Sequence, residues 1–181
     1  MISIQFELPD HQAAIRHLTE AAFAASEFGH SGEANLIDEL RTASDQALSL
    51  VAIQEAEVVG HILFTPVSIH CCDQKCEGMG LAPLSVLPTF QRNGIGSQLV
   101  TAGLRQLSSL NTAFTVVAGH PDFYSRFGFV PAADFGITHG FAGMPQDIFL
   151  IHADDWRSLQ HARNGRAYYL PEFGPQHNSN V

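Results

Sequence analysis

The stretch FQRNGIGSQLV, residues 90–100, places Gly94 and Gly96 one residue apart at the start of a predicted helix, with Arg92 beside them. The first backbone N–H groups of an α-helix have no acceptor inside the helix, and the helix dipole gives them a partial positive charge. Glycines let an anionic group come close to such amides. The pattern therefore predicts a site for an anion such as a phosphate.

Two familiar phosphate-binding motifs do not fit this stretch. A dinucleotide fingerprint needs a third glycine where this chain has Leu99, and a P-loop needs a lysine soon after Gly96. Residues 78–121 nevertheless contain Arg92 and Arg105 and no acidic residue, which favours an anionic ligand. Two other interpretations remain: the glycines only allow a helix to pack closely on a sheet, or RNGIG binds a nucleotide phosphate in an unrelated fold.

The elements expected around this stretch alternate between helices and apolar strands. Helices are predicted at residues 11–28 with Asp10 as N-cap, after Ser31, at 95–110, at 120–127 and around 154–161. Strands are predicted on both sides of a QEAE turn within 48–71, and at 80–87, 114–119, 128–132, 147–152 and 166–170, with loops at 72–79 and 136–145. This order predicts an α/β fold with a mixed sheet in one domain, residues 1–173, followed by a flexible tail, 174–181.

Composition narrows the classes of partner. The 181 residues are 45% hydrophobic, which is enough for one core, and 18 acidic residues face 9 basic ones, of which only Lys75 is a lysine. Proteins that bind nucleic acid or anionic membranes usually have a clustered basic face, so we expect neither partner. Because the N-terminus lacks a signal-peptide pattern and no apolar stretch is long enough to span a bilayer, we expect a cytoplasmic protein.

The three cysteines are too few and too close together for a disulfide framework. Cys71, Cys72 and Cys76 lie in one short segment, and a zinc site there with His70 or Asp73 would lack a second cysteine pair. The ten histidines form no HExxH pair. We therefore expect free thiols and no bound metal.

Two segments together resemble the GNAT superfamily of acetyl-CoA-dependent N-acetyltransferases. LAPLSVLPTFQRNGIGSQLV is similar to that family's cofactor motif, [QR]-x-x-G-x-[GA], after a strand that ends in V-x-P; the matching residues are Gln91, Gly94 and Gly96, with Val86 and Pro88. Further along, VVAGHPDFYSRFGFVPA is similar to the family's F-Y-x-[RK]-x-G-F segment; the matching residues are Phe123, Tyr124, Arg126, Gly128 and Phe129. The order of both segments and of their flanking elements matches the family.

The resemblance implies a fold, a co-substrate and its binding residues. The fold would be GNAT-like, with a mostly antiparallel central sheet flanked by helices and a splay between two central parallel strands. The pyrophosphate of acetyl-CoA or coenzyme A would bind the loop made of Gln91, Arg92, Asn93, Gly94, Ile95, Gly96 and Ser97. The pantetheine arm would pair like an added strand with the backbone of Leu84, Ser85 and Val86.

The resemblance also implies a catalytic acid. Tyr124 would protonate the leaving thiolate, as a phenol with a pKa near 10 can at neutral pH. The alternative is a core aromatic residue beside Phe123 and Phe127. Many members carry a glutamate base on the central strand, but the corresponding stretch here, MGLAPLSV, has no carboxylate. The base stays open among His30, Glu33, His120 and an amine that arrives already neutral.

The function expected from the resemblance is transfer of an acetyl group from acetyl-CoA to a primary amine by direct attack in a ternary complex. The alternative is an acyl-CoA-binding module with a sensing or regulatory role and no efficient turnover. A net charge of −9 suits a cationic small-molecule amine, or a lysine or N-terminal amine of a peptide or protein, better than an amine carried by tRNA. Pairing through the C-terminal strands would be one route to a homodimer.

Overall fold

The computed structural model describes residues 1–24 and 32–176, and the chain divides into two compact units. Unit 1 consists of Met1–Phe64 and Ala82–Gln106, and unit 2 consists of Thr65–Leu81 and Leu107–Val181. Three elements run from one unit into the other: β3 (Glu57–Cys71), β4 (Gln74–Val86) and α3 (Ile95–Ser109). The units are therefore connected by long secondary-structure elements rather than by a linker.

Unit 1 contains the N-terminal strands and most of the long helices. Its remaining elements are β1 (Ile2–Phe6), α1 (Gln12–Ala24), α2 (Glu33–Ala43) and β2 (Leu48–Gln54). β1 pairs antiparallel with β2, β2 pairs antiparallel with β3, and β3 also neighbours β4. The predicted QEAE turn is a tight connection of Glu55 and Ala56, both at positive φ.

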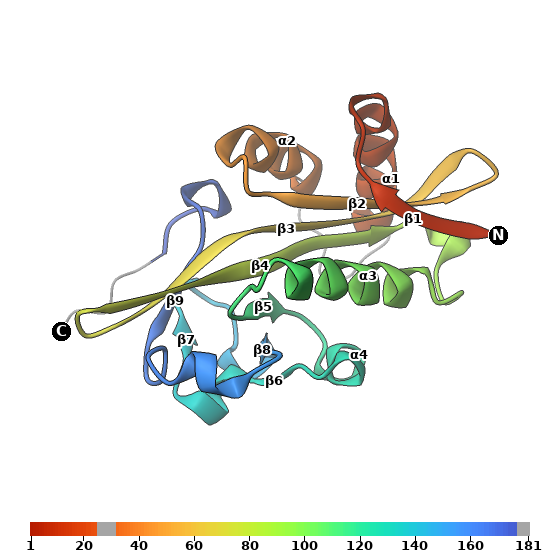
Figure 1. The fold of residues 1–181 in the computed structure, drawn as a ribbon. Helices are drawn as coiled ribbons and strands as arrows, with labels where there is room; N and C mark the ends of the chain where they lie inside the picture. The colour runs from red at the N-terminus through yellow and green to blue at the C-terminus, as the bar shows by residue number, and fades with distance from the viewer. Residues whose placement is uncertain (25–31, 177–181) are drawn as a thin grey trace. The chain divides into compact units, whose positions relative to one another are not determined.

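The two faces of β3 in unit 1 meet different partners, because successive side chains of a strand point to opposite faces. A Cβ added at Gly60 would lie 3.0 Å from Ile95 Cγ2 and from Leu99 Cδ1, so α3 packs closely on this face. The next residue, His61, contacts Ser49 and Glu7 on the other face. Figure 1 accordingly shows α3 on one side of these strands and α2 on the other.

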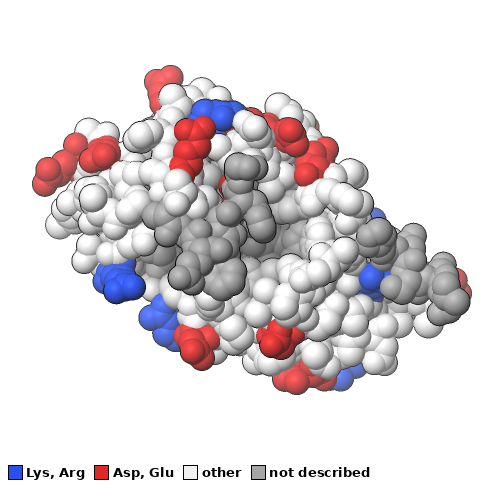
Figure 2. All heavy atoms as spheres, turned by 180° about the vertical axis from the view of Figure 1, so that it is seen from behind, with Lys and Arg blue, Asp and Glu red and all other residues white. Residues whose placement is uncertain are grey.

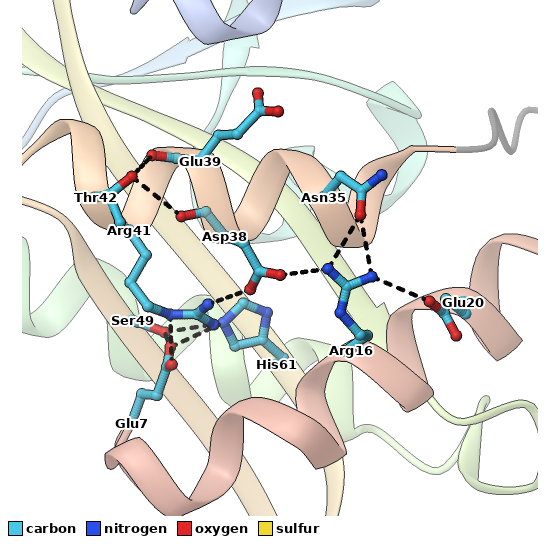
Figure 3. A network of polar contacts seen from close by, with 10 residues as sticks. All are labelled: Glu7, Arg16, Glu20, Asn35, Asp38, Glu39, Arg41, Thr42, Ser49 and His61. Carbon is cyan, nitrogen blue, oxygen red and sulfur yellow. Dashed lines mark hydrogen bonds and ion pairs between the residues drawn. The ribbon is translucent and has the colours of Figure 1, made fainter.

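A polar network ties α1 and α2 to the strands of unit 1 (Figure 3). Arg41 contacts Glu7 Oε1 at 2.7 Å and Asp38 Oδ1 at 2.6 Å, and Asp38 also pairs with Arg16 of α1. Glu7 accepts a hydrogen bond from Ser49, whose hydroxyl lies 2.9 Å from His61 Nε2. The network thus joins two helices, two strands and the residue that follows β1.

Unit 2 contains the shorter C-terminal elements. They are β5 (Thr115–Ala118), α4 (Pro121–Tyr124), β6 (Val130–Pro131), β7 (Thr138–His139), β8 (Phe149–His152) and β9 (Arg166–Tyr168). β5 and β6 both pair antiparallel with β8, and β9 pairs antiparallel with β3. Their inward side chains, among them Val116, Phe149 and Ile151, form a buried apolar core.

Among the strand pairs whose register the structure describes within residues 1–24 and 32–176, two are parallel. β4 pairs with β5 at Met79↔Thr115 and Gly80↔Val116, and β7 pairs with β9. All other strand pairs with a described register are antiparallel, so the predicted mixed, mostly antiparallel α/β fold is confirmed. The prediction that residues 1–173 form one domain stays a prediction.

Four local predictions were wrong. β1 was missed, and the predicted 72–79 loop is mostly strand, because a two-residue turn at Cys72 and Asp73 lets the hairpin of β3 and β4 extend. Asp10 is not the N-cap of α1, which begins at Gln12 after a 3₁₀ turn. The predicted 136–145 loop contains β7. The end of the first helix near residue 28, Ser31 and most of the predicted tail lie outside the described residues.

Candidate functional site

The loop before α3 has an unusual backbone. Arg92 has φ of 62° and Gly94 has φ of 79°, in the left-handed region that glycine adopts at little cost and arginine rarely adopts. A Cβ built at Gly94 would meet nothing within 4 Å. Gly94 is therefore not a packing glycine, and the interpretation that it only allows close helix packing is wrong. Backbone held in sparsely populated conformations is a feature of ligand-binding loops.

The first hydrogen bond of α3 shows which backbone N–H groups have no acceptor inside the helix. Gln98 N–H donates to the Gly94 carbonyl at 3.0 Å, so the amides of Ile95 and Gly96 precede the helical hydrogen-bond ladder. Ile95 is buried, with 2% of its surface exposed, and anchors this end of the helix, whereas residues 91–94 are exposed. The loop thus lies at the solvent-facing side of the helix start, and the buried Ile95 side chain holds the helix end in place.

Side chains fasten the loop to the end of β4. Gln91 Nε2 donates to the Val86 carbonyl at 3.0 Å, and Asn93 Nδ2 donates to the Phe90 carbonyl at 3.4 Å. The first residue of the motif, Gln91, therefore ties the loop to the end of β4. Ser85 is buried, with 2% exposed, while Leu84 and Val86 are partly exposed. All ten predicted cofactor residues, 84–86 and 91–97, lie in unit 1.

Tyr124 ends the short helix α4 in unit 2 and is surrounded by aromatic rings. Its ring makes edge contacts with Phe123 and Phe129, at centroid distances of 4.9 and 5.5 Å. A Cβ at Gly119 would lie 2.5 Å from Tyr124 Cε2, so the ring packs directly on the chain just after β5. Tyr124 is 8% exposed, and burial raises the pKa of its hydroxyl, which keeps the phenol protonated at neutral pH.

The rest of the predicted F-Y-x-[RK]-x-G-F segment holds this turn in shape. Arg126 lies over the Phe123 ring at 4.8 Å, and its Nε donates to the Phe123 carbonyl at 3.2 Å. Gly128 ends the turn at φ of 82°. The arginine and the glycine of the motif therefore position the tyrosine.

One titratable group beside this turn was not singled out from the sequence. The His152 ring on β8 lies 5.4 Å from that of Phe129, which also contacts Tyr124. Burial lowers the pKa of His152, partly opposed by the charge of Asp154, which favours a neutral imidazole at neutral pH. It follows a continuous apolar run, Phe149–Ile151, so the sequence marked the segment only as a buried strand.

The three candidate bases lie in different places. Glu33 is the first residue of α2 in unit 1, and His120 precedes α4 in unit 2, where its carbonyl accepts a hydrogen bond from Tyr124 N–H at 3.2 Å. His30 lies outside the described residues. The three cysteines are free thiols, and the described part of the chain contains no cluster of three potential metal ligands.

Comparisons with known proteins agree on one family. A family model described as an acetyltransferase (GNAT) domain matches residues 9–132. The Escherichia coli protein YhbS, named as an uncharacterized N-acetyltransferase, is 33% identical over 155 residues, which cover 84% of this chain and 88% of YhbS. A second E. coli protein of that description, YjhQ, is 38% identical over 108 residues, covering 59% of this chain and 60% of YjhQ.

Two crystal structures are similar over nearly the whole chain. One is a GNAT family acetyltransferase from Brucella melitensis in complex with acetyl-CoA, with a TM-score of 0.77 and 34% identity, covering 96% of this chain and 99% of that one. The other is YhbS from E. coli in complex with CoA, with a TM-score of 0.84 and 29% identity, covering 95% and 91%. With its fold, both motif segments and these relatives in agreement, the chain belongs to the GNAT family and is an acetyltransferase.

Proposed function

We propose that the protein transfers the acetyl group of acetyl-CoA to a primary amine by direct attack in a ternary complex. The observation that carries this proposal is the loop 91–97, where the exposed residues Arg92 and Gly94 have positive φ and directly precede the start of α3. Two relatives that resemble the chain over more than nine tenths of its length have acetyl-CoA or CoA in their crystal structures, which supports the same ligand here.

The pyrophosphate of acetyl-CoA would bind the amides of residues 91–97. These amides combine a helix start with local positive charge, since residues 78–121 contain two arginines and no acid. The pantetheine arm would bond to the backbone of Leu84–Val86. This backbone is suitable because the pairing of β4 with β5 covers only Met79 and Gly80, upstream of it.

The reaction would proceed in one displacement at the thioester. The amine nitrogen attacks the acetyl carbonyl carbon, a C–N bond forms and the C–S bond breaks. The sulfur takes a proton from the Tyr124 hydroxyl, which burial keeps protonated, and the new ammonium group loses its proton to water. Tyr124 is then reprotonated from solvent. Most of the rate would come from holding the amine against the thioester.

A non-catalytic acyl-CoA-binding module is the second candidate, and one observation favours it. The described β4 stretch Met79–Val86 has no carboxylate where many GNAT members carry their base. The ordered Tyr124 turn argues for the enzyme, because a module without turnover has no need of a buried phenol in that motif.

The cofactor site is tested by calorimetric titration of acetyl-CoA. Gly94→Asp places a negative charge at the proposed pyrophosphate site, and Asp tolerates positive φ. We expect the Kd to rise at least about tenfold, equivalent to about 1.4 kcal/mol. Gly143→Asp is the matched control, since Gly143 has φ of 75° and nothing within 4 Å of its Cβ position. Equal affinity in both folded variants would remove the site from loop 91–97.

A further inference from the structure

Two neighbouring thiols lie together at the tip of the hairpin formed by β3 and β4. Cys71 is the last residue of β3, and Cys72 opens the two-residue turn that leads into β4. Their sulfur atoms are 3.9 Å apart, and Cys71 is half-buried while Cys72 is exposed. The proposed acetyl transfer uses neither thiol.

The backbone of the turn brings the two sulfurs together. Successive side chains of a strand point to opposite faces, so adjacent cysteines inside a strand would hold their sulfurs apart. Cys72 has φ of 53°, which ends the strand and turns its side chain toward that of Cys71. The hairpin below the tip is supported, because Ser68–His70 of β3 pair with β9. All of these residues belong to unit 2.

The third cysteine stands apart from this pair. Cys76 Sγ lies 3.9 Å from the Ser158 carbonyl, and Cys76 packs against the apolar core of unit 2. In residues 1–24 and 32–176, no three His, Cys, Asp or Glu residues form a group that could hold a metal ion. Within those ranges the pair thus offers two sulfur ligands without a third protein ligand.

The separation of the two sulfurs suits a bridging atom better than a direct bond. A disulfide is about 2.05 Å long and usually joins Cα atoms about 4.4–6.8 Å apart, whereas adjacent Cα atoms are about 3.8 Å apart. Oxidation also starts from a thiolate, and desolvation and the neighbouring Cys72 raise the pKa of the Cys71 thiol. For comparison, two thiolates bound to one tetrahedral zinc ion at about 2.3 Å lie about 3.8 Å from each other.

We propose that Cys71 and Cys72 form a dithiol site for a trivalent organoarsenical with one carbon substituent. Such a compound, R–As(OH)2, keeps its carbon bond and has two hydroxyl groups that thiols can replace. Each thiol forms an S–As bond and gives its proton to a departing hydroxyl, so two water molecules are released and neither arsenic nor sulfur is oxidised or reduced. The carbon substituent supplies the third ligand, and the exposed side of the tip accommodates it.

The site is tested with phenylarsine oxide, whose hydrate has this form, on the reduced protein in an excess of glutathione, which competes as a single thiol. Mass spectrometry of the intact protein should find one arsenical per chain, and calorimetric titration gives the Kd. In Cys71→Ser and in Cys72→Ser we expect the Kd to rise at least about a hundredfold, because only one sulfur remains. Cys76→Ser is the matched control and should bind like the wild type.

Thermal unfolding establishes that the variants are folded, which we expect because the tip is at the surface. A Kd in either single variant equal to that of the wild type would overturn the dithiol site. An equal loss in Cys76→Ser, wild-type chains that carry two arsenicals, or no uptake by the wild type would overturn it as well. Because the titration contains no acetyl-CoA, its outcome is independent of the proposed acetyl transfer.

Discussion

At the scale of single residues, the environment of Tyr124 sets what its hydroxyl can do. Its ring is held between Phe123 and Phe129 and against Gly119, and burial raises the pKa of its hydroxyl. The phenol therefore stays protonated across the physiological pH range and can act only as a proton donor. A donor is what a departing thiolate requires.

Removing this hydroxyl while keeping the ring gives a clear kinetic prediction. In Tyr124→Phe we expect kcat to fall by about a hundredfold while the Kd of acetyl-CoA barely changes, because only the proton donor is lost. Steady-state kinetics and calorimetric titration measure the two quantities. Phe127→Leu is a suitable comparison, since Phe127 belongs to the same turn and carries no proton donor. Full turnover in Tyr124→Phe would show that another group protonates the thiolate.

Features that depend on neighbouring residues could be predicted from the sequence, whereas contacts between distant parts of the chain could not. The positive φ at Gly94 and the helix start at Ile95 follow from a few neighbouring residues, so the loop could be predicted from its sequence. The pairing of Gly80 with Tyr169 joins two distant parts of the chain. In the sequence each is an ordinary strand residue, and only folding brings them together.

At the scale of elements, the Glu7 network fixes α2 to the strands of unit 1 (Figure 3). Burial alone would raise the pKa of Glu7, but the polar contact with His61, the hydrogen bond from Ser49 and the charge of Arg41 outweigh it and lower the pKa from 4.5 to about 2. A carboxylate with a lowered pKa stabilises the folded state above pH 4.5. This stability is lost as the pH falls toward 2.

The network therefore predicts a pH-dependent loss of stability. At pH 7 we expect Glu7→Gln to lower the free energy of unfolding by about 3 kcal/mol, the value that corresponds to the pKa difference. At pH 3 the difference should be clearly smaller. Urea unfolding at both values measures it, with Glu20→Gln as control, because the Glu20 side chain is 58% exposed and its ion pair is worth little. A difference equal at pH 7 and pH 3 would contradict the role of the carboxylate.

Two strand segments were missed in the sequence, each for its own reason. β1 has the alternating pattern of a strand in ISIQF, but it is only 5 residues long. The segment Gln74–Glu77 has low strand propensity and becomes strand because the hairpin with β3 supplies its hydrogen bonds. At Gln74–Glu77, strand pairing therefore outweighed local preference, whereas at β1 the pattern was present but short.

At the scale of the whole molecule, the net charge of the protein indicates which kind of acceptor amine it would attract. The chain carries a net charge of −9, and on the face shown in Figure 2 the acidic side chains stand at several separate places with the basic ones dispersed among them. In the described part of the chain no helix is both long and apolar enough to cross a bilayer. Excess negative charge favours encounter with cationic amines. The cytoplasmic location and the possible homodimer stay predictions.

Without a strand carboxylate, the pH dependence of turnover should follow the acceptor. We expect log kcat/KM to rise with pH with a slope near one below the pKa of the amine, because only the neutral amine attacks. The apparent pKa should move when amines of different basicity are compared. Initial rates with two such amines, measured over about four pH units from pH 6 to pH 10, test this expectation. An apparent pKa that stays fixed across amines would point to a protein base, with Glu33, His120 and His152 the first to replace.

The central claim is acetyl transfer to a primary amine, and one assay tests it most directly. Purified protein is incubated with acetyl-CoA and a broad panel of primary amines, while release of the coenzyme A thiol is followed and the products are identified by mass spectrometry. The account predicts thiol release that depends on the amine, one acetylated amine for each thiol, and loss of this activity in Gly94→Asp but not in Gly143→Asp. Tight binding of acetyl-CoA with no amine-dependent thiol release anywhere in the panel would contradict it and favour the binding module.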